Sequence, residues 1–282
     1  SYGSQENIKN NISKIFIYYC ILSFGICLLF NISGVRLFHS FNISMTLVSD
    51  CGFIPTNHLS NIIVTNFQKI ILIGSLLVSM FNFYLLFNIF DKKIITREHK
   101  EDLYLLFLSL ILILFVYFND NSGLDLIISV ISSLTNSGIT LINSDNLSLY
   151  FLLITIIGGS LISNTSGIKL ARFYILLKIT SSEILKLISP NSIINKTIFS
   201  SERKITDDNI KISFLVFISF FLSLFILSSF LILDNIGFEK SFKLSILTLT
   251  NTVNSELFNM ENLNFANLLT TSKISLIIFM II

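Results

Sequence analysis

The sequence contains few charged side chains and no tryptophan. Only 13% of its 282 residues are charged, whereas 52% are hydrophobic, and the mean hydropathy is +0.79. These values exclude a soluble globular domain. The net charge of +2 leaves no strongly basic surface, so nucleic acid is not an expected partner. Any aromatic belt at a membrane surface must rest on the 8 tyrosines and 28 phenylalanines.

The sequence also lacks the residue patterns of a disulfide framework or a hydrolytic site. Cys20 and Cys27 fall within an apolar segment and Cys51 stands alone in a loop, so none has a natural disulfide partner. No HExxH motif, no cluster of carboxylates at membrane depth and no paired nucleophile and histidine occur. We therefore expect neither an enzyme nor a cofactor bound by this chain.

Apolar runs close to the ~20 residues that cross a bilayer recur along the chain. They cover residues 15–30, 70–90, 103–118, 147–157, 214–233 and 274–282. Basic residues concentrate in 91–102 and 186–211, while 119–148 contains three aspartates and no basic residue. The positive-inside rule places the two basic segments in the cytoplasm. These features predict an all-α polytopic membrane protein. Because the sequence starts without methionine and stops inside an apolar run, we expect a fragment or a product lacking both ends.

One pattern repeats three times between these segments. A spanning helix is followed by a short amphipathic helix, a polar turn and a second spanning helix. The short helices are expected at 35–48, 123–134 and 238–249, and the turns at 49–56, 135–140 and 250–256. At ~1.5 Å per residue each short helix covers only about half of a bilayer. They are either surface amphipathic helices or re-entrant pore loops whose carboxyl ends favour a cation at the centre.

A filter for a dehydrated cation needs backbone carbonyls aimed at one axis, and this usually requires glycine with a positive φ. Gly52 and Gly138 meet this requirement, whereas the third turn has Val253 in the same place. Asp50 is either a carboxylate that concentrates cations at a pore mouth or a solvated loop acid. The candidate filter residues are Asp50, Cys51 and Gly52 in the first turn, Asn136, Ser137 and Gly138 in the second, and Thr252, Val253 and Asn254 in the third.

Residues 158–172, GGSLISNTSGIKLAR, interrupt an apolar segment at membrane depth. Each unpaired backbone group there costs several kcal/mol, roughly, so such a break must be buried in protein or line a watery cavity. Lys169 is an intramembrane cation, which marks a functional site. The segment therefore predicts part of a permeation path; the alternative is a poorly packed kink in an ordinary helix.

Together these patterns resemble the Trk/Ktr/HKT superfamily of potassium transporters, in which one chain folds four M1–pore loop–M2 repeats around one pore. Residues 34–53 are similar to the second pore loop of that family, 129–140 to the third and the tail from 248 to the fourth. Residues 158–172 align without gaps to the signature GG..GSTAGGIK..R. The residues that agree with this signature are Gly158, Gly159, Ser163, Gly167, Ile168, Lys169 and Arg172.

The resemblance implies three of four repeats around a pseudo-fourfold pore. They would cover 1–90 (repeat 2), 91–187 (repeat 3, with a broken M2) and 188–282 (repeat 4, with a partial M2). It further implies potassium uptake across the bacterial inner membrane, with potassium as the substrate held by backbone carbonyls of the filter residues. The expected partners are membrane lipid, a second copy in a homodimer and a cytoplasmic nucleotide-binding regulatory subunit. The gate would consist of Gly158, Gly159, Ser163, Asn164, Thr165, Ser166, Gly167 and Lys169.

The sequence also departs from the family pattern. Cys51 replaces a glycine, and the whole first repeat is absent. Further departures are Ile162, Asn164 and Ser166 in place of the usual Gly, Thr and Gly, and Val253 and Asn254 in place of Gly-Pro. Three loops cannot enclose an ion as four do, so this chain alone is not expected to conduct. The alternative is a truncated or decayed, non-conducting membrane protein with a structural or interaction role.

Overall fold

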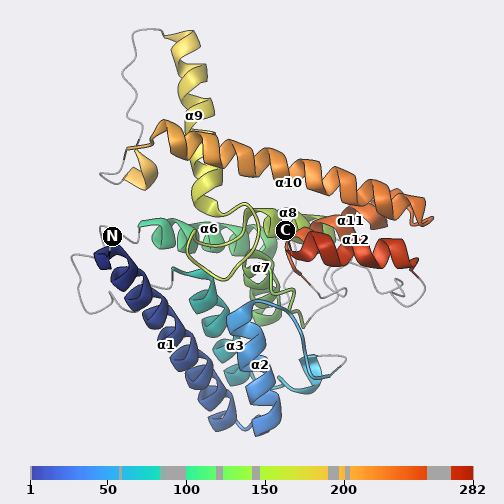
Figure 1. The fold of residues 1–282 in the computed structure, drawn as a ribbon. Coiled ribbons are helices and arrows are strands. Elements are labelled where there is room, and N and C mark those ends of the chain that lie inside the picture. The colour runs from blue at the N-terminus through green and yellow to red at the C-terminus, as the bar shows by residue number, and fades with distance from the viewer. Residues whose placement is uncertain are drawn as a thin grey trace.

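The computed structural model describes residues 2–56, 59–82, 85, 100–118, 123–141, 147–189, 197–200, 204–252 and 268–281. Over these residues the regular structure is helical, apart from one isolated bridge between Thr197 and Lys204 (Figure 1). The α-helices are α1 (Tyr2–Ile32), α2 (Leu37–Ser49), α3 (Asn66–Met80), α6 (Lys100–Tyr117), α7 (Leu124–Thr135), α8 (Ser148–Ile157), α9 (Leu170–Ile188), α10 (Asp207–Leu233), α11 (Phe238–Leu249) and α12 (Thr270–Ile281). Single 3-10 turns occur at Leu59–Asn61 and Ile198–Ser200.

The helices follow the repeated pattern that the sequence predicts. The short helices α2, α7 and α11 each pack against the longer helix that precedes them, which is α1, α6 or α10 (Figure 1). Each is followed by a further apolar helix, α3, α8 or α12, which packs against it as well. The first two short helices lie within two residues of their expected bounds, and α11 has the expected bounds. The prediction of an all-helical architecture is confirmed over the described residues.

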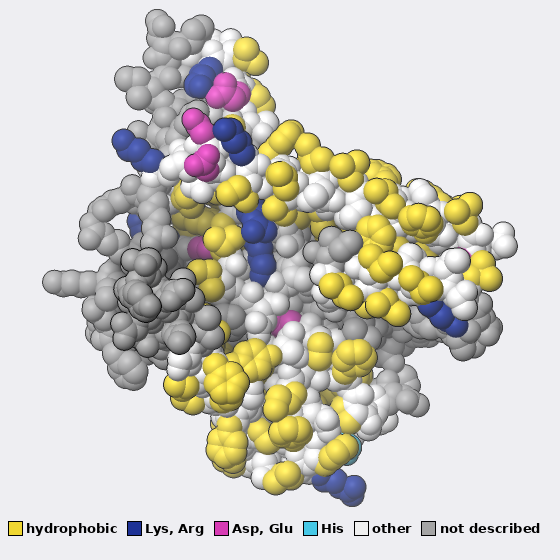
Figure 2. Space-filling model, viewed as in Figure 1, with side chains coloured by type: hydrophobic (Ala, Val, Ile, Leu, Met, Phe, Trp, Pro, Cys, Tyr) yellow, Lys and Arg dark blue, Asp and Glu magenta, His cyan; other side chains and the backbone are white. Residues whose placement is uncertain are grey.

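The segment Ile15–Ile32 of α1, and most of α10, carry apolar side chains on most sides. Within the described residues, segments Ile15–Ile32 and Asp207–Leu233 are long and apolar enough to cross a membrane, and only 28% and 22% of their residues are buried. Hydrophobic side chains accordingly cover α10 and the lower part of the view, where α1 and α2 lie (Figure 2). A helix that is apolar on every side and largely uncovered is suited to contact with lipid.

Helix α7 has the opposite environment. Every residue from 128 to 140 is buried, which includes most of the helix and the turn after it. Its side chains belong to both hydrophobic cores: Val130 and Leu134 pack with α6, α8 and α10–α12, whereas Ile128 and Ile131 pack with α1–α3. Helix α7 therefore joins the two halves of the molecule and fixes the position of the turn at its carboxyl end.

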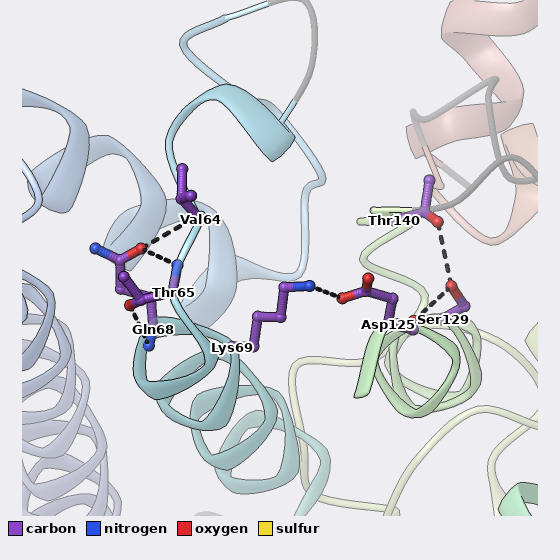
Figure 3. Close-up of polar contacts among 7 residues, drawn as sticks. All are labelled: Val64, Thr65, Gln68, Lys69, Asp125, Ser129 and Thr140. Carbon is purple, nitrogen blue, oxygen red and sulfur yellow. Dashed lines mark hydrogen bonds and ion pairs between the residues drawn. The ribbon is translucent and has the colours of Figure 1, made fainter. Parts of the chain in front are cut away.

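Polar contacts at the start of α3 attach this helix to its neighbours (Figure 3). Thr65 and Gln68 form a reciprocal capping box, and Gln68 Nε2 donates to the carbonyl of Ser33 at 3.1 Å. Lys69 Nζ lies 2.5 Å from Asp125 Oδ1 in the first turn of α7. Helix α3 is thereby held both to the connection after α1 and to α7.

Candidate functional site: the end turns and the broken helix

The three short helices end in the same backbone geometry. A left-handed residue comes directly after α2 and α7 and one residue later after α11: Asp50 (φ 50°), Asn136 (φ 62°) and Asn251 (φ 51°). Aspartate and asparagine tolerate this region better than other non-glycine residues do. The chain therefore reverses at the carboxyl end of each short helix without a glycine at that position.

Each of these end turns also closes with the same hydrogen bond. The amide of the residue after the left-handed position donates to the carbonyl five residues earlier, which is the Schellman arrangement. These bonds are Cys51 to Thr46 (3.3 Å), Ser137 to Ser132 (3.2 Å) and Thr252 to Leu247 (2.8 Å). The three turns are thus structural equivalents, although their sequences DCG, NSG and NTV differ.

The glycines of the first two end turns have the predicted positive φ. Gly52 has φ 71° and Gly138 has φ 66°. In the first turn the Thr46 hydroxyl donates to the carbonyl of Phe53 at 2.5 Å. This bond holds the residues after the turn against the end of α2. In the third turn Val253 stands in the place of these glycines. Val253 and Asn254 both lie outside the described residues, and Thr252 is the last filter candidate described.

Asp50 is buried, which excludes its interpretation as a solvated loop acid. Its side chain is 5% exposed, and Oδ1 accepts a hydrogen bond from the Ser79 hydroxyl of α3 at 3.0 Å. Among the described residues, Oδ2 has no hydrogen-bond partner. Lys169 is near enough to Asp50 for the two charges to interact. The carboxylate is therefore part of the protein interior beside the first end turn.

The predicted break in the second helix of the middle unit is present. Helix α8 ends at Ile157 and α9 begins at Leu170, and the 158–169 loop between them is irregular. Some of its backbone amides are paired within the protein: Gly159 donates to Thr165 Oγ1 at 2.9 Å, and Ser160 donates to the Met80 carbonyl at 3.1 Å. This segment is not a kink in a continuous helix. It is a folded loop that packs against other elements and leaves only Leu161 and Ile162 exposed.

Two glycines of the loop are required by close packing. A Cβ on Gly159 would lie 2.8 Å from the Met80 carbonyl oxygen and 2.7 Å from Thr165 Oγ1. Gly167 has φ 83°, and a Cβ there would lie 3.0 Å from the Ile156 carbonyl oxygen. The distances at Gly159 are too short for a Cβ, and at Gly167 a tight contact adds to a positive φ that other residues rarely adopt, so glycine suits both positions against α3 and α8.

Lys169 turns back into its own loop. Its Nζ donates to the Ser163 carbonyl at 3.1 Å, to Ser163 Oγ at 3.3 Å, to Thr165 Oγ1 at 3.0 Å and to the Thr165 carbonyl. The ammonium group is thus surrounded by oxygens of the loop, as a bound cation would be. Lys169 holds the loop in one compact conformation.

The loop also contacts the ends of all three short helices. Asn164 Nδ2 donates to the Val48 carbonyl in the last turn of α2, and the Ser166 hydroxyl donates to the Thr250 carbonyl directly after α11. Asn136, which follows α7, donates to Ser166 Oγ at 3.4 Å. The three end turns therefore converge on the loop from three different units of the chain.

Two residues of this site were not predicted from the sequence. Glu101, in the first turn of α6, accepts the Leu161 amide at 2.8 Å and so holds the far side of the loop. Asn251 takes the left-handed position of the third end turn. The preference of asparagine for that conformation was the available signal for Asn251. No sequence spacing connects Glu101 with Leu161.

Comparisons with known proteins agree with this geometry. The crystal structure of the potassium transporter TrkH from Vibrio parahaemolyticus superimposes with a TM-score of 0.85 over 97% of this chain, at 19% identity. The chain has the TrkH fold. It is also 31% identical, over 225 residues, to a Methanocaldococcus jannaschii protein named "uncharacterized cation transporter MJ1485". No protein-family model matches the chain.

The likeness to the TrkH fold agrees with the resemblance to the Trk/Ktr/HKT superfamily and with the expectation of a multi-pass membrane protein. Both similar proteins are named as transporters, in agreement with the prediction that the chain is not an enzyme. The chain spans 61% of the TrkH structure and 44% of the Methanocaldococcus jannaschii protein, so it corresponds to only part of each.

Proposed function

We propose that this chain forms part of a cation-conducting pore that takes up potassium, with the three end turns as filter segments. One observation carries the proposal: the end turns of α2, α7 and α11 converge on the 158–169 loop. Helix carboxyl ends carry partial negative charge, so three of them meeting at one point favour a cation there. The positive φ of Gly52 and Gly138 suits backbone carbonyls that face a common axis.

In this proposal the 158–169 loop is the gate. It contacts the ends of the filter segments, and its Gly159, Ser160 and Leu161 amides are paired with the loop itself, α3 and α6. In the conformation described here it closes the path. Opening must therefore displace the loop, and a buried loop rich in small residues can move without exposing large apolar side chains to the path.

The remaining features of the proposal follow from the resemblance. The protein would lie in the inner membrane, act as a homodimer and respond to a cytoplasmic nucleotide-binding subunit. The preference for potassium over sodium belongs to the same proposal, since the Vibrio parahaemolyticus protein is titled a potassium transporter.

The experiment that tests this proposal compares the glycines that flank α7, Gly123 before it and Gly138 in the turn after it. With the first repeat that the resemblance implies supplied, we expect the protein in liposomes to take up potassium in preference to sodium, and Gly138→Ala to reduce that preference several-fold. Alanine at a positive φ costs about 1–2 kcal/mol, and the turn must shift to avoid that cost. Gly123→Ala is the matched control, because Gly123 has φ 63° at the other end of α7 with no atom within 4 Å of its Cβ position.

Three results would count against the proposal or part of it. An unchanged selectivity in Gly138→Ala would remove this residue from the filter. The same loss in Gly123→Ala would indicate a general effect on α7. Folded protein with no cation flux would favour the alternative, a non-conducting membrane protein with a structural or interaction role. The substituted residues Asn164 and Ser166, which fasten the loop, are the observation that favours this alternative.

A further inference from the structure

We propose that Asn164 and Ser166 form a latch that is specific to this chain and holds the 158–169 loop closed. The expected effect of the latch on cation flux rests on the proposed function. The hydrogen bonds that form the latch do not depend on it. Its two hydrogen bonds reach from the middle unit of the chain to the units on either side in sequence.

The first half of the latch is the Asn164 side chain. Its Nδ2 donates to the carbonyl of Val48, in the last turn of α2. The last four carbonyls of a helix have no donor within the helix, so they are available to an external donor or to a cation. Asn164 therefore supplies a hydrogen-bond donor to the Val48 carbonyl, which has none within α2.

The second half is the Ser166 hydroxyl. It donates to the carbonyl of Thr250, the residue directly after α11, and its oxygen accepts from Asn136 Nδ2 at 3.4 Å. One hydroxyl thus connects the loop to two end turns at once. Thr250 is fully buried, so this contact is shielded from water and loses little strength to competing solvent.

Both latch residues are departures from the family signature that the sequence otherwise matches. The signature has threonine where Asn164 stands and glycine where Ser166 stands. Glycine has no side-chain donor, and the threonine hydroxyl is one bond shorter than the asparagine amide. The two cross-unit bonds described here therefore depend on residues that the signature does not supply.

The latch occupies oxygens that a cation would use. Carbonyl oxygens at a helix carboxyl end are cation ligands as well as hydrogen-bond acceptors. While Asn164 and Ser166 donate to them, the loop and an ion compete for the same groups. The closed loop is consequently favoured over its displaced state by the free energy of these bonds.

Restoring the signature residues tests the latch. In a version of the protein that also contains the first repeat, we expect Ser166→Gly and Asn164→Thr each to raise basal cation flux in liposomes roughly three- to tenfold. One ordinary hydrogen bond supports a change in equilibrium of this size. The double variant should exceed either single variant. Ile162→Gly is the matched control, because Ile162 is the third departure in the same loop but its exposed, apolar side chain donates no hydrogen bond.

Hydrogen exchange of the 158–169 peptide supplies a readout that does not depend on transport. Exchange should quicken in Ser166→Gly and Asn164→Thr and stay unchanged in Ile162→Gly, with equal thermal unfolding in detergent for all three. Quickened exchange without flux in any variant would support the latch and refute the proposed function. Unchanged exchange in both latch variants, or an equal response in Ile162→Gly, would overturn the latch.

Discussion

At the scale of single residues, polar side chains of the site bind backbone oxygens that would otherwise bind water or an ion. Lys169 places an ammonium group among four oxygens of Ser163 and Thr165. Asp50 is held by Ser79 in the interior. A buried charge needs such partners, because an unpaired one costs far more than a lost hydrogen bond. Polar residues at membrane depth here therefore stabilise a particular loop conformation.

Replacing Lys169 with alanine should loosen that conformation. Four oxygens of Ser163 and Thr165 lose the donor Nζ, although Thr165 Oγ1 keeps its hydrogen bond from the Gly159 amide. The partly buried Ser163 groups then gain by turning toward water. We expect basal cation flux to rise in Lys169→Ala while the protein remains folded, as judged by size-exclusion chromatography and thermal unfolding. Lys178→Ala, a change in the same residue type further along α9, should leave flux unaltered.

A fall in flux, or no change with normal expression, would contradict this role for Lys169. It would indicate that the ammonium group assists permeation or is irrelevant to it.

The residue pattern predicted the left-handed glycines but not the left-handed residues before them. Gly52 and Gly138 are recognisable because only glycine adopts a positive φ freely. Asp50 is a filter candidate from the sequence as a carboxylate at the pore mouth, and Asn136 belongs to the second polar turn, whereas Asn251 is not among the candidates. The equivalence of the three turns depends on backbone hydrogen bonds, which no single residue type in the sequence specifies.

At the scale of helices, α7 connects two cores, and its position is set at both ends. Its carboxyl end reaches the loop through Asn136, and its first turn is tied to α3 by the 2.5 Å pair of Lys69 and Asp125. The side chains of this pair are only 18% and 26% exposed, so solvent screens their attraction less than at an open surface. Asp125 also lies at the amino end of α7, where negative charge is favoured.

We expect Asp125→Asn to lower the thermal unfolding temperature in detergent, because it leaves Lys69 without its partner. A double-mutant cycle with Lys69→Met should give a coupling of about 1 kcal/mol that falls as salt is raised. Glu183→Gln is the control: Glu183 pairs with Lys186 at 2.8 Å, but both side chains are well exposed, and their coupling should be smaller.

A coupling near zero for Lys69 and Asp125 at low salt would show that packing alone sets the distance between α3 and α7.

The helices themselves were largely predictable, and the path of the loop between them was not. Apolar periodicity and length identify the short helices, and the polar turns mark their ends, so α11 has the expected bounds. The break after α8 follows from two adjacent glycines in an apolar segment. The contact of Leu161 with Glu101 joins residues 60 positions apart, and such a pairing depends on tertiary packing that local patterns do not encode.

At the scale of the whole molecule, the charge pattern and the fold together give an orientation. The basic segment 186–211 contains the start of α10, and the turn at Leu59–Asn61 lies between the first end turn and α3. The positive-inside rule predicts that the basic segment 186–211 lies in the cytoplasm. In the repeated pattern, the turn at Leu59–Asn61 then lies on the outer side of the membrane. The polar contacts at the start of α3 (Figure 3) then lie toward the outer face.

Single cysteines in a background without Cys20, Cys27 and Cys51 test this orientation. Asp208→Cys should react with a membrane-impermeant thiol reagent only after the cells are opened, and Asn61→Cys should react in intact cells. Both side chains are exposed in the structure, so reactivity reports the side of the membrane and not burial. Reaction of Asp208→Cys in intact cells would overturn the topology.

The anchors of the 158–169 loop come from separate parts of the chain, and this has a consequence for how it moves. Val48, Thr250 and Asn136 belong to three different units, while Met80 and Glu101 hold the side facing α3 and α6. If one of these hydrogen bonds breaks, the loop gains little conformational freedom because the others still hold it. Partly released conformations of the loop are therefore poorly populated. Displacement of the 158–169 loop is consequently cooperative. The loop moves in one all-or-none step, and the path does not widen gradually.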